Sequence, residues 1–98
     1  MYKALYFAEV FADIQKAKEW YKEQQDGLEI RFAICIEEAI MKILAMPTAY
    51  NIRHKNVRIA HPKTFPYNIH FYINENEKTV VLIGIVFNKR KDALKLER

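Results

Sequence analysis

The chain has 98 residues, of which 51% are hydrophobic and 13% aromatic. That is enough apolar material for one core, so we expect a single domain covering residues 1–98. No segment reaches the roughly 18 to 20 apolar residues of a membrane span, and the first residues have neither the basic region nor the small-residue cleavage site of a signal peptide. We therefore expect a cytoplasmic protein that has no membrane partner.

The net charge is +4, and the basic residues that produce it are unevenly distributed. They gather in two segments, one around residues 53–58 and one directly after the apolar run that ends at residue 87. Such patches suit an anionic partner, either nucleic acid or an acidic protein segment, although a plain solvated surface would carry the same residues. The residues that we expect to bind a target are Arg53, Lys55, Arg58, Lys89, Arg90 and Lys91.

The first half of the chain predicts one strand and two helices. Residues 2–7 are rich in aromatic side chains and contain neither Gly nor Pro, as is typical of a strand. From residue 9 to about residue 25 apolar side chains recur at helical spacing, and a second, wider helical stripe covers residues 28–46. Gly27 lies between them, where a helix cap needs the left-handed conformation, and Pro47 ends the second helix.

The second half predicts three strands. Residues 51–55 are polar and basic, and we expect them to connect the second helix to a short strand at 57–60. Apolar and polar side chains alternate from residue 65 to residue 73, which gives this strand one buried and one solvated face. Residues 79–87 are apolar at nearly every position and predict an interior strand, joined to the preceding one by the short polar loop 74–78.

These elements predict an α+β fold with the order β-α-α-β-β-β. The short connection between the helices makes them antiparallel, so they form a helical hairpin on one face of an antiparallel sheet of about four strands. The strand at 79–87 is interior only if the strand at 2–7 closes its other edge. We expect these two strands to run in opposite directions.

Several residues of this fold occur in an order and spacing that characterise a known family. They are Asp13-Ile14, Ala17, Trp20-Tyr21, Gly27-Leu28, Phe32, Pro47, Tyr50, Arg58 and Phe65-Pro66-Tyr67. From about residue 10 to residue 90 the chain thereby resembles the RelE/ParE superfamily of type II toxin–antitoxin toxins. The fold of that family, an antiparallel sheet carrying a helical hairpin, is the one that the periodicity predicts.

The resemblance implies a toxin that a cognate antitoxin neutralises by forming a hetero-oligomer with it. RelE-like toxins cut mRNA on the ribosome without a metal ion, whereas ParE-like toxins poison DNA gyrase. A third alternative is an antitoxin-binding module whose toxic activity has decayed. None of the three implies a cofactor, and no Cys and His residues have the spacing of metal ligands.

A ribonuclease of this kind needs a general acid or base and cationic groups on one surface. The candidate catalytic residues are Arg58, His70 and Arg90. Two features depart from the RelE-like pattern. Residues 91–98 contain no aromatic side chain that could stack on a substrate base, and of the family pattern H..R.P only Arg90 is matched, because Phe87 replaces the histidine and Asp92 the proline. Both departures are also consistent with the decayed binding module. The missing aromatic side chain, the modest charge of +4 and the presence of His70 as the single near-neutral titrating group predicted on the sheet favour gyrase as the target.

Four further side chains have a structural explanation. We expect Trp20 and Tyr21 on the first helix to pack against the rest of the protein, and Tyr67 to pack in the core with a partner for its hydroxyl group. Cys35 is the single cysteine and lies within an apolar helical stripe. It is expected to be a small buried side chain without a redox role.

Overall fold

The structure is a computed structural model that describes residues 1–88. The predicted target-binding residues Lys89, Arg90 and Lys91 lie outside the described residues, as does Asp92. The elements are β1 (Lys3–Tyr6), α1 (Ala8–Gln24), α2 (Leu28–Ala45), the 3-10 turn η1 (Pro47–Ala49), β2 (Ile52–His54), β3 (Val57–Ala60), β4 (Tyr67–Asn74) and β5 (Thr79–Phe87). Each helix and strand expected from the sequence is present, with ends within one or two residues of those predicted.

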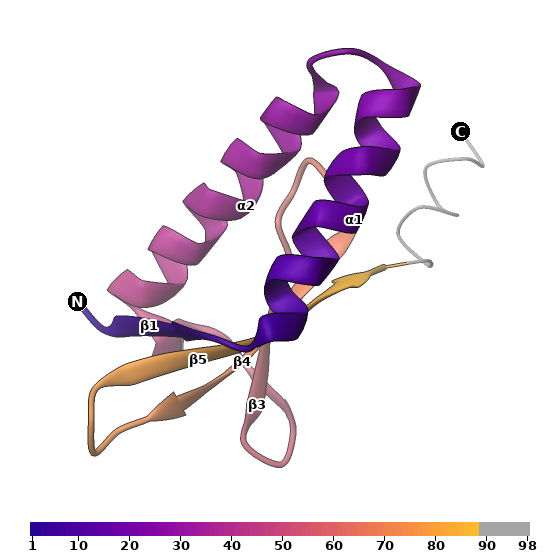
Figure 1. Ribbon diagram of the computed structural model, residues 1–98. Helices are drawn as coiled ribbons and strands as arrows, with labels where there is room; N and C mark the ends of the chain where they lie inside the picture. The colour runs from indigo at the N-terminus through magenta and orange to yellow at the C-terminus, as the bar shows by residue number, and fades with distance from the viewer. Residues whose placement is uncertain (89–98) are drawn as a thin grey trace.

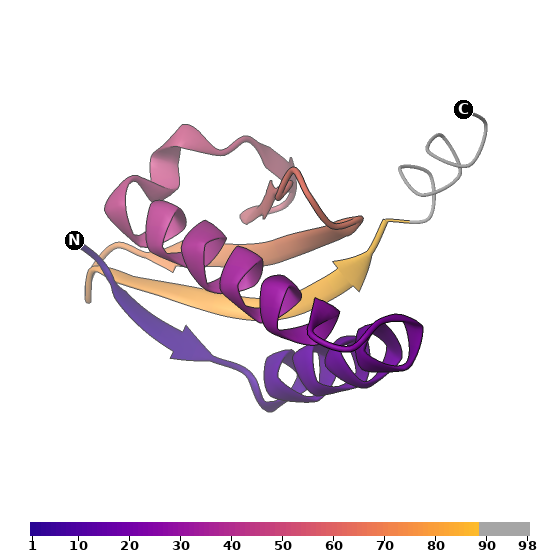
Figure 2. The same cartoon turned by 90° about the horizontal axis from the view of Figure 1, so that it is seen from above.

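The two helices form a hairpin that lies on one face of the sheet (Figures 1 and 2). Gly27 connects them in the left-handed conformation, with φ of +93°, as the sequence predicts. Other residues meet a Cβ clash in this conformation, which explains the glycine. Among the described residues, neither α1 nor α2 has both the length and the apolar character that crossing a bilayer requires.

The sheet has five strands in the order β1-β5-β4-β3-β2, which corrects the expectation of about four. The additional strand, β2, lies within residues 51–55, which we expected to be a simple connection. The direction of β1 is a second correction, because β1 runs parallel to β5 and the sheet is mixed. Both corrections have one cause. β2 adds one more reversal of chain direction after the helices, and with this extra reversal β5 runs in the same direction as β1.

β5 is an interior strand, flanked by β1 and β4. This confirms the interpretation of its nearly continuous apolar sequence. On the helix side the core is formed by an aromatic cluster in which Phe32 of α2 contacts Tyr21, Phe65 and Tyr67, with ring centroids 5.2 to 5.3 Å apart. Edge-to-face contacts of this kind add to the free energy of burying the rings.

The packing expectations are confirmed for two residues and wrong for one. Tyr21 and Tyr67 pack on the aromatic cluster. Cys35 is partly buried against the same core. Trp20, however, is 57% exposed. Its neighbour Tyr21 occupies the side of α1 that faces the sheet, and adjacent helical residues point about 100° apart.

Replacing Phe32 should show how far stability depends on this cluster. Phe32→Ala removes a fully buried ring and should lower the free energy of unfolding by about 3–5 kcal/mol. Ile30→Ala is the matched control, because Ile30 is on the same helix but 59% exposed, and it should cost less than about 0.5 kcal/mol. Urea unfolding followed by circular dichroism measures both, and similar losses in the two variants would contradict the packing described here.

Candidate functional site

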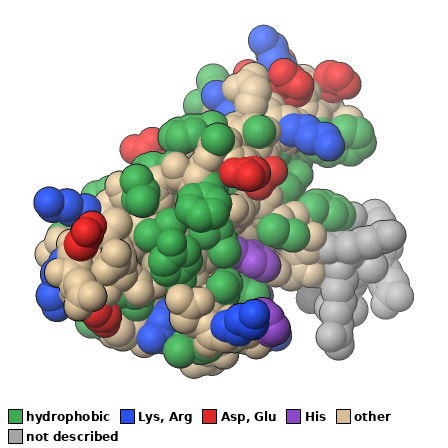
Figure 3. Space-filling model, turned by 60° about the horizontal axis from the view of Figure 1, so that its bottom comes forward, with side chains coloured by type: hydrophobic (Ala, Val, Ile, Leu, Met, Phe, Trp, Pro, Cys, Tyr) green, Lys and Arg blue, Asp and Glu red, His purple; other side chains and the backbone are tan. Residues whose placement is uncertain are grey.

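The face of the sheet that the helices leave uncovered carries polar side chains along β4. Ile69 and Phe71 are buried in the core, and because side chains alternate along a strand, Asn68 and His70 lie on the opposite, open face. Figure 3 shows the molecule from this side, with hydrophobic side chains gathered over the sheet and histidine side chains beside them. The predicted alternation of residues 65–73 is confirmed.

A hydrogen-bonded network joins three side chains on this face. His61 directly follows β3, and its Nδ1 lies 2.8 Å from Oδ1 of Asn68. The amide nitrogen of Asn88 donates to the same oxygen over 3.3 Å. Because Asn68 uses its oxygen toward Asn88, His61 donates its Nδ1–H to that oxygen as well, and its second ring nitrogen, Nε2, is left for a ligand.

His70 lies in the middle of the open face, opposite Ile59 of β3 and Gly84 of β5. Burial is the main cause that lowers the pKa of His70 below its usual 6.5, and the positive charge of His61 lowers this pKa further. At neutral pH the imidazole of His70 is therefore uncharged and can accept a proton. Gly84 places no side chain against it from β5.

Arg58 lies on the other face of the sheet. It pairs with Phe71 across β3 and β4, so its side chain shares the face of that buried ring. Its Nη1 donates a hydrogen bond of 2.6 Å to the backbone oxygen of Tyr50. The structure thus brings His61 close to His70, while Arg58 and His70, two of the predicted catalytic residues, point to opposite faces.

Arg53 and Lys55, two predicted target-binding residues, form a basic edge at some distance from this network. Arg53 is on the edge strand β2, and Lys55 follows it in the turn to β3, with φ of +53°. Both side chains are exposed. They precede β3 whereas His61 follows it, so they lie at the opposite end of that strand.

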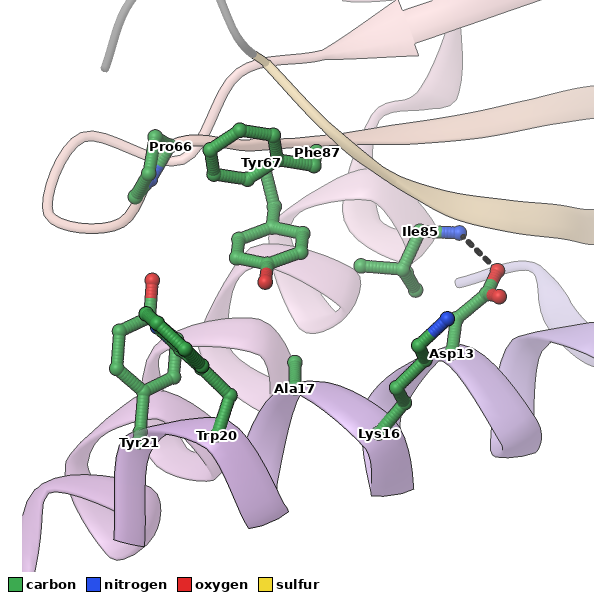
Figure 4. Close-up of a pocket in the computed structure, with 9 residues that line it drawn as sticks. All are labelled: Asp13, Lys16, Ala17, Trp20, Tyr21, Pro66, Tyr67, Ile85 and Phe87. Carbon is green, nitrogen blue, oxygen red and sulfur yellow. Dashed lines mark hydrogen bonds between the residues drawn. The ribbon is translucent and has the colours of Figure 1, made fainter. Parts of the chain in front are cut away.

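A pocket of about 590 Å³ lies between α1 and the ends of β4 and β5 (Figure 4). Its aromatic wall consists of Trp20, Tyr21, Tyr67 and Phe87. At its margin Asp13 of α1 accepts a hydrogen bond of 3.0 Å from the backbone N–H of Ile85. The carboxylate of Asp13 thereby satisfies a backbone N–H group of β5, which is a structural role.

A second hollow runs along the outer side of the helical hairpin, with a volume of about 290 Å³. Its walls are mainly apolar side chains from α1 and α2, and Phe11 and Met41 at its rim are 60% and 49% exposed. Lys18 and Glu37 are its charged lining residues. This is the apolar surface that the wide stripe of the second helix predicted.

Sequence reasoning did not identify His61 as a partner of His70. The two residues are nine positions apart, and only the register of β3 against β4 places them on one face. The sequence signal that could have identified this pair is the turn between β3 and β4, because the turn sets the register of the two strands. Within residues 1–88, no three His, Cys, Asp or Glu side chains are arranged to hold a metal ion.

The interaction between the two histidines can be measured by NMR titration. The ring protons of His70 should titrate with a midpoint below pH 6.5, because burial and the charge of His61 both disfavour the imidazolium. His61→Gln should raise this midpoint while leaving it below 6.5, since burial is the larger cause. His54→Gln, at the exposed edge strand, should leave it unchanged. A midpoint that does not respond to His61→Gln would show that the two rings do not interact.

Comparison with known proteins identifies solved structures that have a similar fold. No family model and no curated protein matches the sequence. Among solved structures, the chromosomal ParDE TA system from P. aeruginosa superposes with a TM-score of 0.76 at 14% identity, over 89% of this chain and 96% of that chain. The isolated E. coli RelE toxin gives a TM-score of 0.66 at 12% identity over both full chains. The intact E. coli RelBE toxin–antitoxin complex gives 0.64 at 12% identity, over 89% of this chain and 96% of that chain. The chain therefore has the fold shared by the RelE and ParE toxins.

Proposed function

We propose that this protein is the toxin of a type II toxin–antitoxin pair, acts in the cytoplasm and is neutralised by a cognate antitoxin. The observation that carries this proposal is the apolar hollow on the helical hairpin, in a chain with the fold of RelE and ParE toxins. A protein that works alone has little reason to keep Phe11 and Met41 exposed side by side over an apolar hollow. A partner helix with an apolar face would bury both.

The charge distribution suits an antitoxin segment that is acidic and disordered when free. Such a segment can fold on contact and extend over a large surface. From the hairpin it can continue to the edge strand β2, whose unpaired backbone groups accept another strand and whose Arg53 and Lys55 attract carboxylates. We expect charge reversal at these two residues to slow association and reduce its salt dependence.

Substitutions at the hollow should test the antitoxin site directly. Met41→Glu and Phe11→Ala should each weaken antitoxin binding about fivefold or more, because truncating or charging a central apolar contact costs more than about 1 kcal/mol. Trp20→Gln is the control, since Trp20 is equally exposed but lies at the other pocket. Calorimetric titration of each variant with the antitoxin gives the affinities. Unchanged affinity in both hollow variants would remove the basis for this site.

Cleavage of RNA is the toxic activity that we propose first. One reason for favouring gyrase is that the sequence predicts His70 as the single near-neutral titrating side chain on the sheet, and His61, close to His70 on the same face, supplies a second one. Gyrase inhibition stays the second candidate, and a specific observation favours it. Arg58 points away from the histidines, so the arginine expected in a ribonuclease site does not lie beside them.

Two assays on the purified protein separate the candidates. In a translation extract, we expect mRNA to be cut while supercoiling by gyrase proceeds normally, because the histidine pair supplies proton transfer and gyrase poisoning does not need it. Growth arrest on expression, relieved by the antitoxin, tests the toxin function itself. Inhibited supercoiling with intact mRNA would exchange the order of the two candidates. Absence of growth arrest together with antitoxin binding would instead indicate the decayed binding module.

A further inference from the structure

We propose that His61 and His70 are a complete acid–base pair that cleaves single-stranded RNA without the ribosome. The inference rests on the proposed ribonuclease activity and adds to it the residues and the independence from a second macromolecule. His61 is the proposed general acid and His70 the general base, and Asn68 is a positioning residue for His61. The substrate class is an RNA phosphodiester with a free 2′-hydroxyl group.

The backbone places the two imidazoles at a suitable separation. Ile59 pairs with His70 and Ala60 with Ile69, so the next residue, His61, lies opposite Asn68. His61 and His70 are thus diagonal neighbours on one face of an antiparallel pair, a relation in which residues are about 7–8 Å apart and their Cβ atoms somewhat closer. In the proposed complex one phosphodiester group lies between the two rings.

The surroundings of the two rings differ in burial and in hydrogen bonding. Partial burial keeps His70 uncharged, so it can take up a proton at neutral pH. The hydrogen bond from Nδ1 of His61 to Asn68 directs Nε2 of His61 to a ligand, and Asn88 holds the amide of Asn68 in that orientation. Two rings in different environments can therefore take opposite roles.

The chemical step is a transphosphorylation that balances without any further reactant. His70 removes the proton of the 2′-hydroxyl group, and the 2′-oxygen forms a bond to phosphorus. The bond from phosphorus to the 5′-oxygen breaks, and the protonated His61 gives its proton to that oxygen. The products are a 2′,3′-cyclic phosphate and a 5′-hydroxyl end.

Two other titratable groups among the described residues lie near His70: Tyr72, on the same face of β4, and Asp13 of α1, whose Oδ2 is 3.8 Å from the position that a Cβ of Gly84 would take. On β5 the facing positions are Gly84 and Val86, which do not titrate. On β4 the next residue on the same face is Tyr72, and on β3 it is Ile59. α1 and α2 pack on the other face (Figure 2). Because both proton-transfer groups belong to this chain, the reaction has no need of groups from the ribosome.

The test uses the full-length protein and a DNA oligonucleotide that contains a single ribonucleotide. We expect cleavage at that ribonucleotide, a 2′,3′-cyclic phosphate product, and no cleavage of the all-DNA oligonucleotide. His61→Gln and His70→Asn should each reduce the rate about 100-fold or more. The control is His54→Gln. It changes the remaining one of the three histidines, which lies on the exposed edge strand, and it should keep the rate within about twofold. Because the side chain of His61 is exposed, we expect His61→Gln to fold normally, so a loss of activity in this variant reports on the chemistry and not on misfolding.

The pH profile separates the positioning role of Asn68 from a purely structural one. The wild-type rate should be bell-shaped, with an acid limb below pH 6.5 because the pKa of His70 is lowered. Asn68→Asp should move the basic limb to higher pH, because a carboxylate hydrogen-bonded to His61 favours its protonated form, and it should move the acid limb less. An equal loss of rate at every pH would contradict the positioning role.

Three results would overturn the inference. They are intact free RNA in the presence of active toxin, cleavage that survives His61→Gln, and cleavage of the all-DNA strand. If mRNA is cut in the translation extract while free RNA stays intact, the proposed ribonuclease function stands and the ribosome supplies what this pair lacks. If neither RNA is cut but growth stops, the ribonuclease proposal itself fails.

Discussion

β5 can exist only if both of its edges and its helix-facing side are covered, and this requirement positions the other elements. β4 covers one edge along its full length. β1 has four residues and covers the other edge only as far as Leu82. Beyond that point Asp13 accepts the N–H of Ile85, so a carboxylate on a helix replaces the missing strand. A buried backbone N–H without an acceptor costs about 1–3 kcal/mol, which explains why α1 lies along this edge.

The position of α1 divides the molecule into two working surfaces. On the helix side it forms the hollow with α2 and the aromatic pocket with the sheet ends. On the other side the sheet is left open, and His61 and His70 lie there. An antitoxin bound at the hollow does not by itself cover the histidines. For the proposed toxin and RNA cleavage, neutralisation would require either a segment that continues around the β2 edge or an antitoxin bulky enough to keep RNA away, and the basic residues on β2 favour the first route.

Much of this fold could be predicted because its signals are local. The apolar run of β5, the helical stripes and the glycine between the helices each act within a short window. β2 was missed because its three exposed residues, Ile-Arg-His, form no periodic pattern, and its omission reversed the predicted direction of β1 relative to β5. His61 was missed for a related reason. Its closeness to His70 is a property of strand register, which single-residue patterns do not contain.

The environment of Arg58 determines how mutations at this site can be interpreted. Its guanidinium ties β3 to the backbone of Tyr50, and Tyr50 packs on Phe71 with ring centroids 5.7 Å apart. Hydrogen bonds from a charged group to a partly buried carbonyl contribute about 1.5–3 kcal/mol. Loss of toxicity in Arg58→Ala would thus combine any catalytic effect with weakened attachment of the η1 segment to the sheet. His61 is exposed, and within residues 1–88 its hydrogen bond goes to the neighbouring amide of Asn68. A change at His61 therefore alters the chemistry of the open face while the core beneath it stays intact. For this chain the exposed histidine, and not the arginine that the family resemblance singles out, is the informative position.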